Sequence, residues 1–295
     1  MSTLFCFGLG YSAQVLAAKL KAKGWGVVGT TREMNKAADL AAQDYDLHLF
    51  DGTAPLADAS VMAPATHLLI SVPADDDTDP VLRWHAADIA KLQHLKWLGY
   101  LSTTGVYGDR GGDWVDESSD LRPSQARSKR RAEAEAAWLA LWREHSVPVH
   151  VFRLAGIYGP GRSQLESLRR GTAKRLVKPG QVFCRIHVED IAQVLQASIA
   201  RPDPGAIYNV ADDEPAPPQD VVAYAAKLLG MAPPPEEPFD AAKLTPMAAS
   251  FYADNRRVRN DRIKRELGVT LKYPTYREGL RAMAAPLAAQ LQDRA

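Results

Sequence analysis

The first half of the chain alternates short apolar runs with segments of helical periodicity. Unbroken apolar runs predict buried strands, and apolar residues that recur three or four positions apart predict helices. A further helix is expected to begin at Asp79-Pro80, a capping residue followed by a proline. The alternation predicts an α/β fold, a doubly wound parallel sheet covered on both faces. The predicted strands are residues 4–7, 25–30, 47–50, 67–72, 97–102 and 149–154, and the predicted helices include 12–23 and 127–142.

The alternation loosens after Gly156, and prolines crowd residues 215–218 and 233–235. Residues 186–188 and 206–210 still predict strands, and residues 190–200 and 219–229 predict helices. We therefore expect a main domain and a smaller, loop-rich C-terminal lobe that binds the substrate. The main domain is predicted to comprise residues 1–158 and about 185–212, and the lobe about 159–184 and 213–295.

Composition narrows the class of protein. The chain of 295 residues is 46% hydrophobic and 24% charged, which excludes a disordered protein. Its net charge of +1 gives no reason to expect a nucleic acid or an anionic membrane as partner. No apolar run approaches the ~18 residues of a membrane-spanning helix, and the apolar run after Met1 is too short for a signal peptide. Cys6 and Cys184 make neither a disulfide scaffold nor a zinc site. The expectation is a cytoplasmic protein without a metal.

A glycine-rich loop carries the first chemical signal. Gly8, Gly10 and Ala13 follow the first predicted strand with the spacing G-x-G-x-x-A and lead into the first predicted helix. The first glycine permits a tight turn, the second lets a pyrophosphate approach the backbone, and the small third residue lets helix and strand pack closely. The helix N-terminus, with Tyr11 and Ser12, would then face the phosphates. The alternative is an ordinary strand-to-helix turn, but the strand–turn–helix context favours a dinucleotide site.

The end of the second strand indicates which dinucleotide is bound. Folds that select NAD usually place an acidic residue here, whereas this chain has Thr31 and Arg32, which suit the 2′-phosphate of NADP. NAD is the alternative, because Glu33 is close enough in sequence to reach a ribose. Asp51 is a candidate partner of the adenine amino group, or a residue of an Asp-Gly turn. Ser71 and Val72, at the end of the fourth strand, complete the candidate cofactor site.

Four further segments follow the glycine loop along the chain: LSTTGVYG at 101–108, RLAGIYGPGR at 153–162, RIHVEDIA at 185–192 and AIYNV at 206–210. Together with the glycine loop they resemble the extended short-chain dehydrogenases/reductases, which include the sugar-nucleotide epimerases and dehydratases. The resemblance implies a Rossmann fold and a nicotinamide cofactor, and it assigns Tyr158 to the cofactor site.

The same resemblance implies candidate catalytic residues. The family places a Ser or Thr after the fifth strand and Tyr-x-x-x-Lys on the next helix, where the i, i+4 spacing puts both side chains on one face. Thr103 occupies the first position and Lys129 the lysine position, while Gln125 stands at the tyrosine position. Glutamine donates a hydrogen bond but delivers no proton near neutral pH. The pattern is similar to atypical branches that lack the tyrosine. The resemblance also implies that Lys129 binds the nicotinamide ribose of the cofactor. The alternative for Lys129 is an exposed charged helix face that it shares with Arg130, Arg131, Glu133 and Glu135.

Substrate contacts are predicted from the same segments. Thr104, Arg162, Arg185 and His187 are the candidates, and Phe183 stands where sugar-nucleotide epimerases carry an arginine for the nucleotide diphosphate. For His187 a structural role beside a helix start is the alternative. The basic run at residues 256–265 is interpreted as a salt-bridged, solvated helix face.

Two functions remain open. The first is an NADP-preferring oxidoreductase or epimerase/dehydratase-like enzyme that acts on a small polar substrate, sugar-like substrates included. The second is a catalytically silent NADP-binding sensor or partner-binding protein, since Gln125 replaces the tyrosine. By analogy with the family, a homodimer is the candidate assembly, with Trp138 and Trp142 as interface residues.

Overall fold

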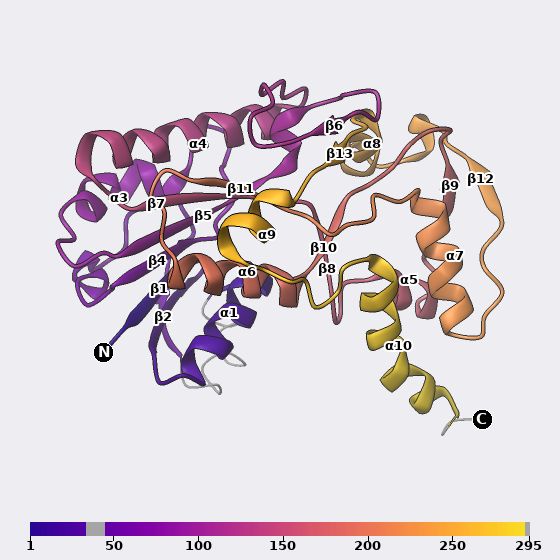
Figure 1. Cartoon of the computed structure of the whole chain (residues 1–295), viewed down its shortest axis with the longest axis horizontal. Helices are drawn as coiled ribbons and strands as arrows, with labels where there is room; N and C mark the ends of the chain where they lie inside the picture. Colours follow the sequence, from indigo (N-terminus) through magenta and orange to yellow (C-terminus); the bar gives the residue numbers. More distant parts are fainter. Residues whose placement is uncertain (34–44, 293–295) are drawn as a thin grey trace.

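The computed structural model describes residues 1–33 and 45–292, and its centre is a seven-stranded sheet in which all neighbouring strands are parallel. The predicted α/β fold is confirmed (Figure 1). Within the described ranges, no helix combines the length and apolar character needed to cross a bilayer. The strand order is β11 (Ile207–Val210), β7 (Val149–Leu154), β5 (Trp97–Thr103), β4 (His67–Ile70), β1 (Thr3–Phe7), β2 (Gly26–Thr31) and β3 (Asp46–Leu49).

The strand order changes direction at β1, and this switch point determines where a ligand can bind. From β1 the chain first builds outward through β2 and β3, then returns to the other side through β4, β5 and β7. Leu4 pairs with Val27 on one side and with His67 on the other. Because helices leave β1 and β4 toward opposite faces, a crevice opens at the carboxyl ends of these two strands, and ligands of such sheets bind there.

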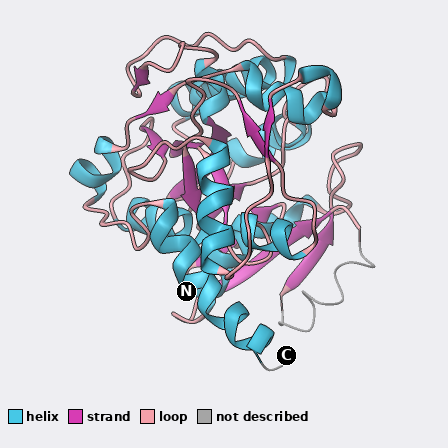
Figure 2. Ribbon diagram, turned by 90° about the vertical axis from the view of Figure 1, so that its right-hand side faces the viewer, coloured by secondary structure: helices cyan, strands magenta, loops and turns pink. Residues whose placement is uncertain are grey.

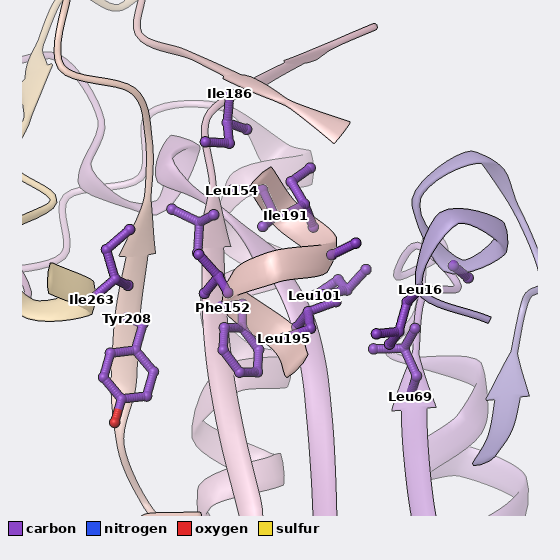
Figure 3. Packing of buried hydrophobic residues seen from close by; sticks show 14 of the residues in the cluster. Leu16, Leu69, Leu101, Phe152, Leu154, Ile186, Ile191, Leu195, Tyr208 and Ile263 are labelled. Atoms are coloured by element: carbon purple, nitrogen blue, oxygen red, sulfur yellow. The ribbon is translucent and has the colours of Figure 1, made fainter. Parts of the chain in front are cut away.

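Helices cover both faces of the sheet (Figure 1). Helices α1 (Tyr11–Lys21) and α6 (Val188–Ala200) pack together on one face, and α3 (Pro80–Ala90) and α4 (Ala126–His145) on the other. Figure 3 shows Leu16 of α1 and Leu195 of α6 pointing toward Leu69 and Phe152 of the sheet. Helix α3 begins where predicted, because the Asp79 carboxylate accepts hydrogen bonds from the Val81 and Leu82 N–H groups.

A second lobe lies beside the carboxyl ends of the strands (Figure 1). It has its own apolar cluster. Leu165, Val222 and Leu280 are buried in that cluster. The same lobe faces the viewer in Figure 2, where α10 runs down to the C-terminus. Its elements are β8 (Gly156–Tyr158) with β10 (Arg185–His187), β9 (Arg175–Val177) with β12 (Glu236–Pro238), α5 (Gln164–Arg169), α7 (Pro218–Leu228), α8 (Pro246–Ala253) and α10 (Tyr276–Gln292).

Part of the predicted lobe packs on the main domain instead. Ile263 and Leu267 of α9 (Asp261–Leu267) are buried in the cluster that also holds Tyr208 of β11. The amphipathic α9 therefore covers the edge strand of the sheet, which protects its exposed backbone groups. The remaining short elements are β6 (Trp114–Val115), paired with β13 (Arg257–Val258), and the 3₁₀ helices η2 (Ala59–Met62), η3 (Thr104–Tyr107) and η4 (Ala241–Lys243).

Trp138, expected at a dimer interface, lies inside the monomer. Its ring is fully buried and its Nε1–H donates to Asp79 Oδ2 at 3.3 Å. Trp142 packs over Gly205, where an added Cβ would meet the indole ring at 2.4 Å. Both indoles therefore serve the contact between α4 and the main sheet. The homodimer itself stays a prediction.

Candidate functional site

A cavity of about 860 Å³ lies between the carboxyl ends of the central strands and the second lobe. It extends from the start of α1 through the ends of β4, β5 and β7 to α7, α8 and α10. The crevice of the main sheet and the inner face of the lobe thus form one continuous space. The predicted site residues that line it are Ser12, Ser71, Thr103, Thr104, Tyr158, Arg162 and Arg185.

The glycine loop has the geometry that a pyrophosphate needs. Gly8 has φ +82°, a value that favours glycine, and its N–H donates to Thr30 Oγ1. Gly10 caps α1 with extended backbone and no side-chain hydrogen bond, and no acidic residue stands in the first turn. A Cβ added at Gly10 would meet no atom within 4 Å. The helix therefore opens on empty space with uncapped N–H groups, which fits the phosphates of a dinucleotide.

Tyr11 joins this loop to the second lobe. Its hydroxyl donates to the Pro160 carbonyl at 3.0 Å, and the Arg162 guanidinium lies 5.9 Å from its ring centre. Burial is the main cause that raises the pKa of Tyr11. The Tyr11 side chain thus connects the start of α1 to the segment after β8, while Ala13 is buried as the small third residue of the motif requires.

The residues predicted for the adenosine end lie outside the main cavity. Arg32 is exposed, and Thr31 Oγ1 donates to the Glu33 carbonyl at 3.2 Å. Asp51 Oδ1 accepts hydrogen bonds from the N–H and hydroxyl of Thr53, which lower the pKa of its carboxyl. Val72 packs against Gly8, since a Cβ added at Gly8 would lie 3.1 Å from Val72 Cγ2.

At the end of β5, Thr103 presents a hydroxyl to the cavity. Its Oγ1 accepts the Gly105 N–H at 3.1 Å, so the hydroxyl hydrogen remains available to a ligand. The neighbouring Ser102 donates to Glu135 at 2.5 Å. The two adjacent hydroxyls therefore differ: the Thr103 hydroxyl has its hydrogen free at the cavity, and the Ser102 hydroxyl is bound to α4.

Gln125 and Lys129 do not join Thr103 at this cavity. Gln125 is the N-cap residue of α4 and lines a separate shallow pocket with Tyr252 and Lys178. The Lys129 side chain is exposed and does not line the main cavity. The residue of α4 that does line it is Arg131, whose Nη1 donates to the Leu101 carbonyl at 2.6 Å. The exposed charged face expected for this helix is therefore wrong for Arg131, which is half-buried, and for Glu135, which is buried against the sheet. The catalytic roles inferred from the motif therefore stay predictions, without the proximity that they require.

Arg185, a half-buried arginine, lines the cavity. Nη1 of Arg185 donates to the carbonyls of Phe183 and Ala216, and burial lowers the pKa of its guanidinium. Asp212 is buried close by, its Oδ2 has no hydrogen-bond partner in the structure, and its pKa is raised well above the usual value by burial. Tyr158, whose hydroxyl donates to the Thr275 carbonyl, has its pKa raised by burial and by the negative charge of Asp212.

His187 serves the fold rather than the cavity. It is buried, its Nδ1 accepts the Glu189 N–H and caps α6, and its ring lies 4.2 Å from the ring of Tyr273 between the centres. Burial lowers the pKa of His187 to about 4, so the neutral ring is the stable form. The placement of His187 agrees with the alternative interpretation, a structural role beside the start of a helix.

Several lining residues were not foreseen from the sequence. Arg256, assigned to a solvated helix face, precedes α9 and is mostly buried; it pairs with Asp254 at 3.1 Å and donates to the Gly108 carbonyl. That interpretation is corrected for Arg256, because the chain turns inward at this point. The remaining unforeseen residues sit in irregular stretches without a periodic signal: Phe251, Tyr252 and Tyr276. Across the part of the chain that the structure describes, no three His, Cys, Asp or Glu side chains gather to hold a metal ion.

Known proteins place these features in a family. Residues 8–211 match the model of the NAD dependent epimerase/dehydratase family. Over 93% of this chain and 97% of its own length, the Escherichia coli protein YeeZ is 29% identical. A structure of a functionally unknown conserved protein from Silicibacter pomeroyi is 53% identical, covers 97% of this chain and 99% of its own, and superposes with a TM-score of 0.88.

More distant structures share the fold alone. A dTDP-glucose 4,6-dehydratase of Bacillus anthracis, solved in complex with NAD, is 17% identical and has a TM-score of 0.78 over 100% of this chain and 98% of its own. The family model covers the glycine loop, the end of β5 and the strand β11 that closes the sheet. The chain belongs to the NAD dependent epimerase/dehydratase family.

Proposed function

We propose that the protein is a nicotinamide-dependent oxidoreductase or epimerase/dehydratase-like enzyme that prefers NADP and acts on a small polar substrate. The observation that carries this proposal is the uncapped start of α1, where Ser12 lines the same cavity as Thr103. The same cavity thus holds N–H groups that can bind phosphate, at the start of α1, and the Thr103 hydroxyl, at the end of β5. A nicotinamide bound there would give or take a hydride.

Different residues of the chain would bind the different parts of the cofactor and the substrate. The N–H groups at the start of α1 and the Ser12 hydroxyl would hold the pyrophosphate, and Ser71 would stand beside it at the end of β4. Thr103 would donate its hydroxyl hydrogen to a substrate oxygen and fix its position. Arg32, exposed at the end of β2, would meet the 2′-phosphate of NADP.

A reaction at the substrate oxygen also needs a proton donor. Burial is the main cause of the raised pKa at Tyr158, Tyr252 and Tyr276, the phenols that line the cavity, so each is a weaker acid than in water. Such phenols orient a substrate by hydrogen bonds and stay protonated at neutral pH. We assign the proton to water in the cavity, which has polar and apolar walls and reaches the surface beside Arg170.

A titration of the purified chain with NADPH and with NADH tests this proposal. We expect NADPH to bind at least about tenfold more tightly, with enhanced nicotinamide fluorescence, since one charge-assisted contact to a phosphate contributes roughly 1.4 kcal/mol. A panel of aldehydes, ketones and sugars is then screened for oxidation of the bound NADPH. Failure of both nucleotides to bind would overturn the proposal. Binding without turnover of any compound would favour the silent sensor instead.

A further inference from the structure

Helix α4 turns one particular face toward the cavity. Glu135 and Trp138, four and seven residues after Arg131, are buried against the sheet, so Arg131 lies on the face that meets β5. A step of two residues along a helix is a rotation of about 200°, and Lys129 therefore points to the other side. Exposure agrees, since the Lys129 side chain is exposed and Arg131 is half-buried.

Arg131 is held in place by contacts that leave most of its donors available. The Leu101 carbonyl accepts from Nη1 at 2.6 Å, and the guanidinium lies 5.6 Å from the ring centre of Tyr100. A guanidinium carries five N–H donors; the Leu101 carbonyl occupies one, and the Tyr100 hydroxyl is close enough to interact with another. Arg131 lines the cavity together with Ser71 and Thr103, at the end where the start of α1 opens. The side chain is thus anchored and still presents charge to a ligand.

No carboxylate neutralises this charge by direct contact. Among the described residues, none lies within ion-pair distance of Arg131. Glu135, one turn further along α4, is bound to Arg153. The nearby Asp79 carboxylate is occupied by the N–H groups at the start of α3 and by the Trp138 indole. A half-buried cation without a carboxylate partner favours an anionic ligand.

The rest of the cavity lining also carries more positive than negative charge. Its acidic lining residues are Glu166, which accepts hydrogen bonds from Gly161 and Ser163, and Asp254, which is paired with Arg256. The basic lining residues outnumber them: Arg131, Arg162, Arg170, Lys174, Arg185 and Arg256. The excess of positive charge would attract and concentrate anionic molecules in the cavity.

We propose that Arg131 binds an anionic group of the substrate, a carboxylate or a phosphate, next to the reacting carbon, and so determines substrate specificity. A guanidinium stays protonated at any physiological pH, so α4 supplies fixed positive charge at this point and relays no proton. Arg127 lies one turn before Arg131, and its guanidinium is 4.5 Å from the ring centre of Phe251 at the cavity wall. This inference rests on the proposed function, because it names the substrate class of the same site.

The test measures anion binding to the NADPH-loaded protein and to the protein without nucleotide. Malonate serves as the carboxylate probe and inorganic phosphate as the other, in calorimetric titrations at constant ionic strength. We expect one probe to bind, and Arg131→Met to weaken it by about tenfold or more, as loss of a charge-assisted contact does. Arg131→Lys, which keeps the charge without the fork, should weaken it less. The affinity for NADPH should change by less than about threefold.

Arg143→Met is the matched control, since it removes the same side chain from an exposed position at the far end of α4. It should leave probe binding unchanged. Wild-type protein that binds neither anion would overturn the inference. Equal anion binding by Arg131→Met and wild type would also overturn it. So would a loss of anion binding in Lys129→Met that Arg131→Met does not show. Anion binding without any nucleotide binding would instead overturn the proposed function alone.

Discussion

Arg153 and Glu135 form a buried ion pair, with Nη2 2.7 Å from Oε2, that ties the end of β7 to the middle of α4. Glu135 also accepts the Ser102 hydroxyl, and Arg153 Nη1 donates to the Tyr107 hydroxyl, which donates to Asn209 of β11. The network therefore joins three strand ends directly behind the cavity. It fixes the rotation of α4 about its axis, and with it the residue that α4 presents to the ligand.

Breaking this pair should destabilise the fold. Glu135→Gln leaves the Arg153 guanidinium buried without a counter-charge, and we expect the free energy of unfolding to fall by about 3 kcal/mol. Chemical denaturation measures the loss. Glu133→Gln, at an exposed position of the same helix, should stay within about 0.5 kcal/mol of wild type. The double variant Glu135→Gln/Arg153→Met should lose less than the sum of the single losses; an additive result would contradict the coupling.

Two glycines of the same loop should respond differently to alanine. At Gly10, φ is −89° and the space is open, so Gly10→Ala should keep the free energy of unfolding within about 0.5 kcal/mol and weaken NADPH by about tenfold or more. At Gly8, φ is +82° and Val72 Cγ2 is 3.1 Å from the added Cβ, so Gly8→Ala should cost about 1–2 kcal/mol of stability. Nucleotide titration and denaturation separate the two effects. A Gly10→Ala protein with unchanged affinity would show that no phosphate lies there.

Arg32 should decide between the two nucleotides. Arg32→Ala removes the guanidinium at the end of β2, and we expect the dissociation constant for NADPH to rise by about tenfold while that for NADH stays within about twofold. Fluorescence titrations with both nucleotides check this. Arg83→Ala, at a half-buried arginine of α3 paired with Asp75, is the control and should leave the ratio of the two constants unchanged. Equal losses for NADPH and NADH would place Arg32 outside the 2′-phosphate site.

Stability should fall in acid because buried histidines are held neutral. Nε2 of His150 accepts the Asp203 N–H at 2.9 Å and Nδ1 lies 3.3 Å from the Leu98 carbonyl, while burial lowers the pKa of His150 to about 4. The unfolded chain, with an ordinary pKa of about 6.5, binds more protons between these values. His150 thus contributes stability that is fully present above about pH 6.5 and is lost as pH falls toward 4.

The variant His150→Phe isolates this contribution. Between pH 6.5 and 4, its free energy of unfolding should fall less steeply than that of wild type, by up to about 1.4 kcal/mol per pH unit. Denaturant titrations across the range give both slopes. Above pH 7.5 the two profiles should run parallel, separated by the constant cost of the substitution. Parallel profiles down to pH 4 would mean that His150 is not held neutral by the fold.

Local signals in the sequence were sufficient for the main sheet. The apolar runs, the Asp79-Pro80 start of α3 and the G-x-G-x-x-A spacing each depend on residues within one turn or one strand of each other. The structure confirms the strands and the parallel fold that these signals predict. The helix 127–142 was also predicted in the right place. The face of this helix that lines the cavity was not predicted, because the spacing of a motif counts positions and does not give the rotation of the helix about its axis.

The sequence by itself determined the element order, the parallel fold and the loop that suits a dinucleotide, since each follows from short-range periodicity and backbone requirements. Only the tertiary structure decided which side chains share the cavity. The buried pair of Glu135 and Arg153 sets the rotation of α4, so Arg131 and not Lys129 lines the wall. Arg256, far along the chain, reaches the same space from a segment without periodicity. Such encounters depend on long-range packing and charge pairing, which no local pattern encodes.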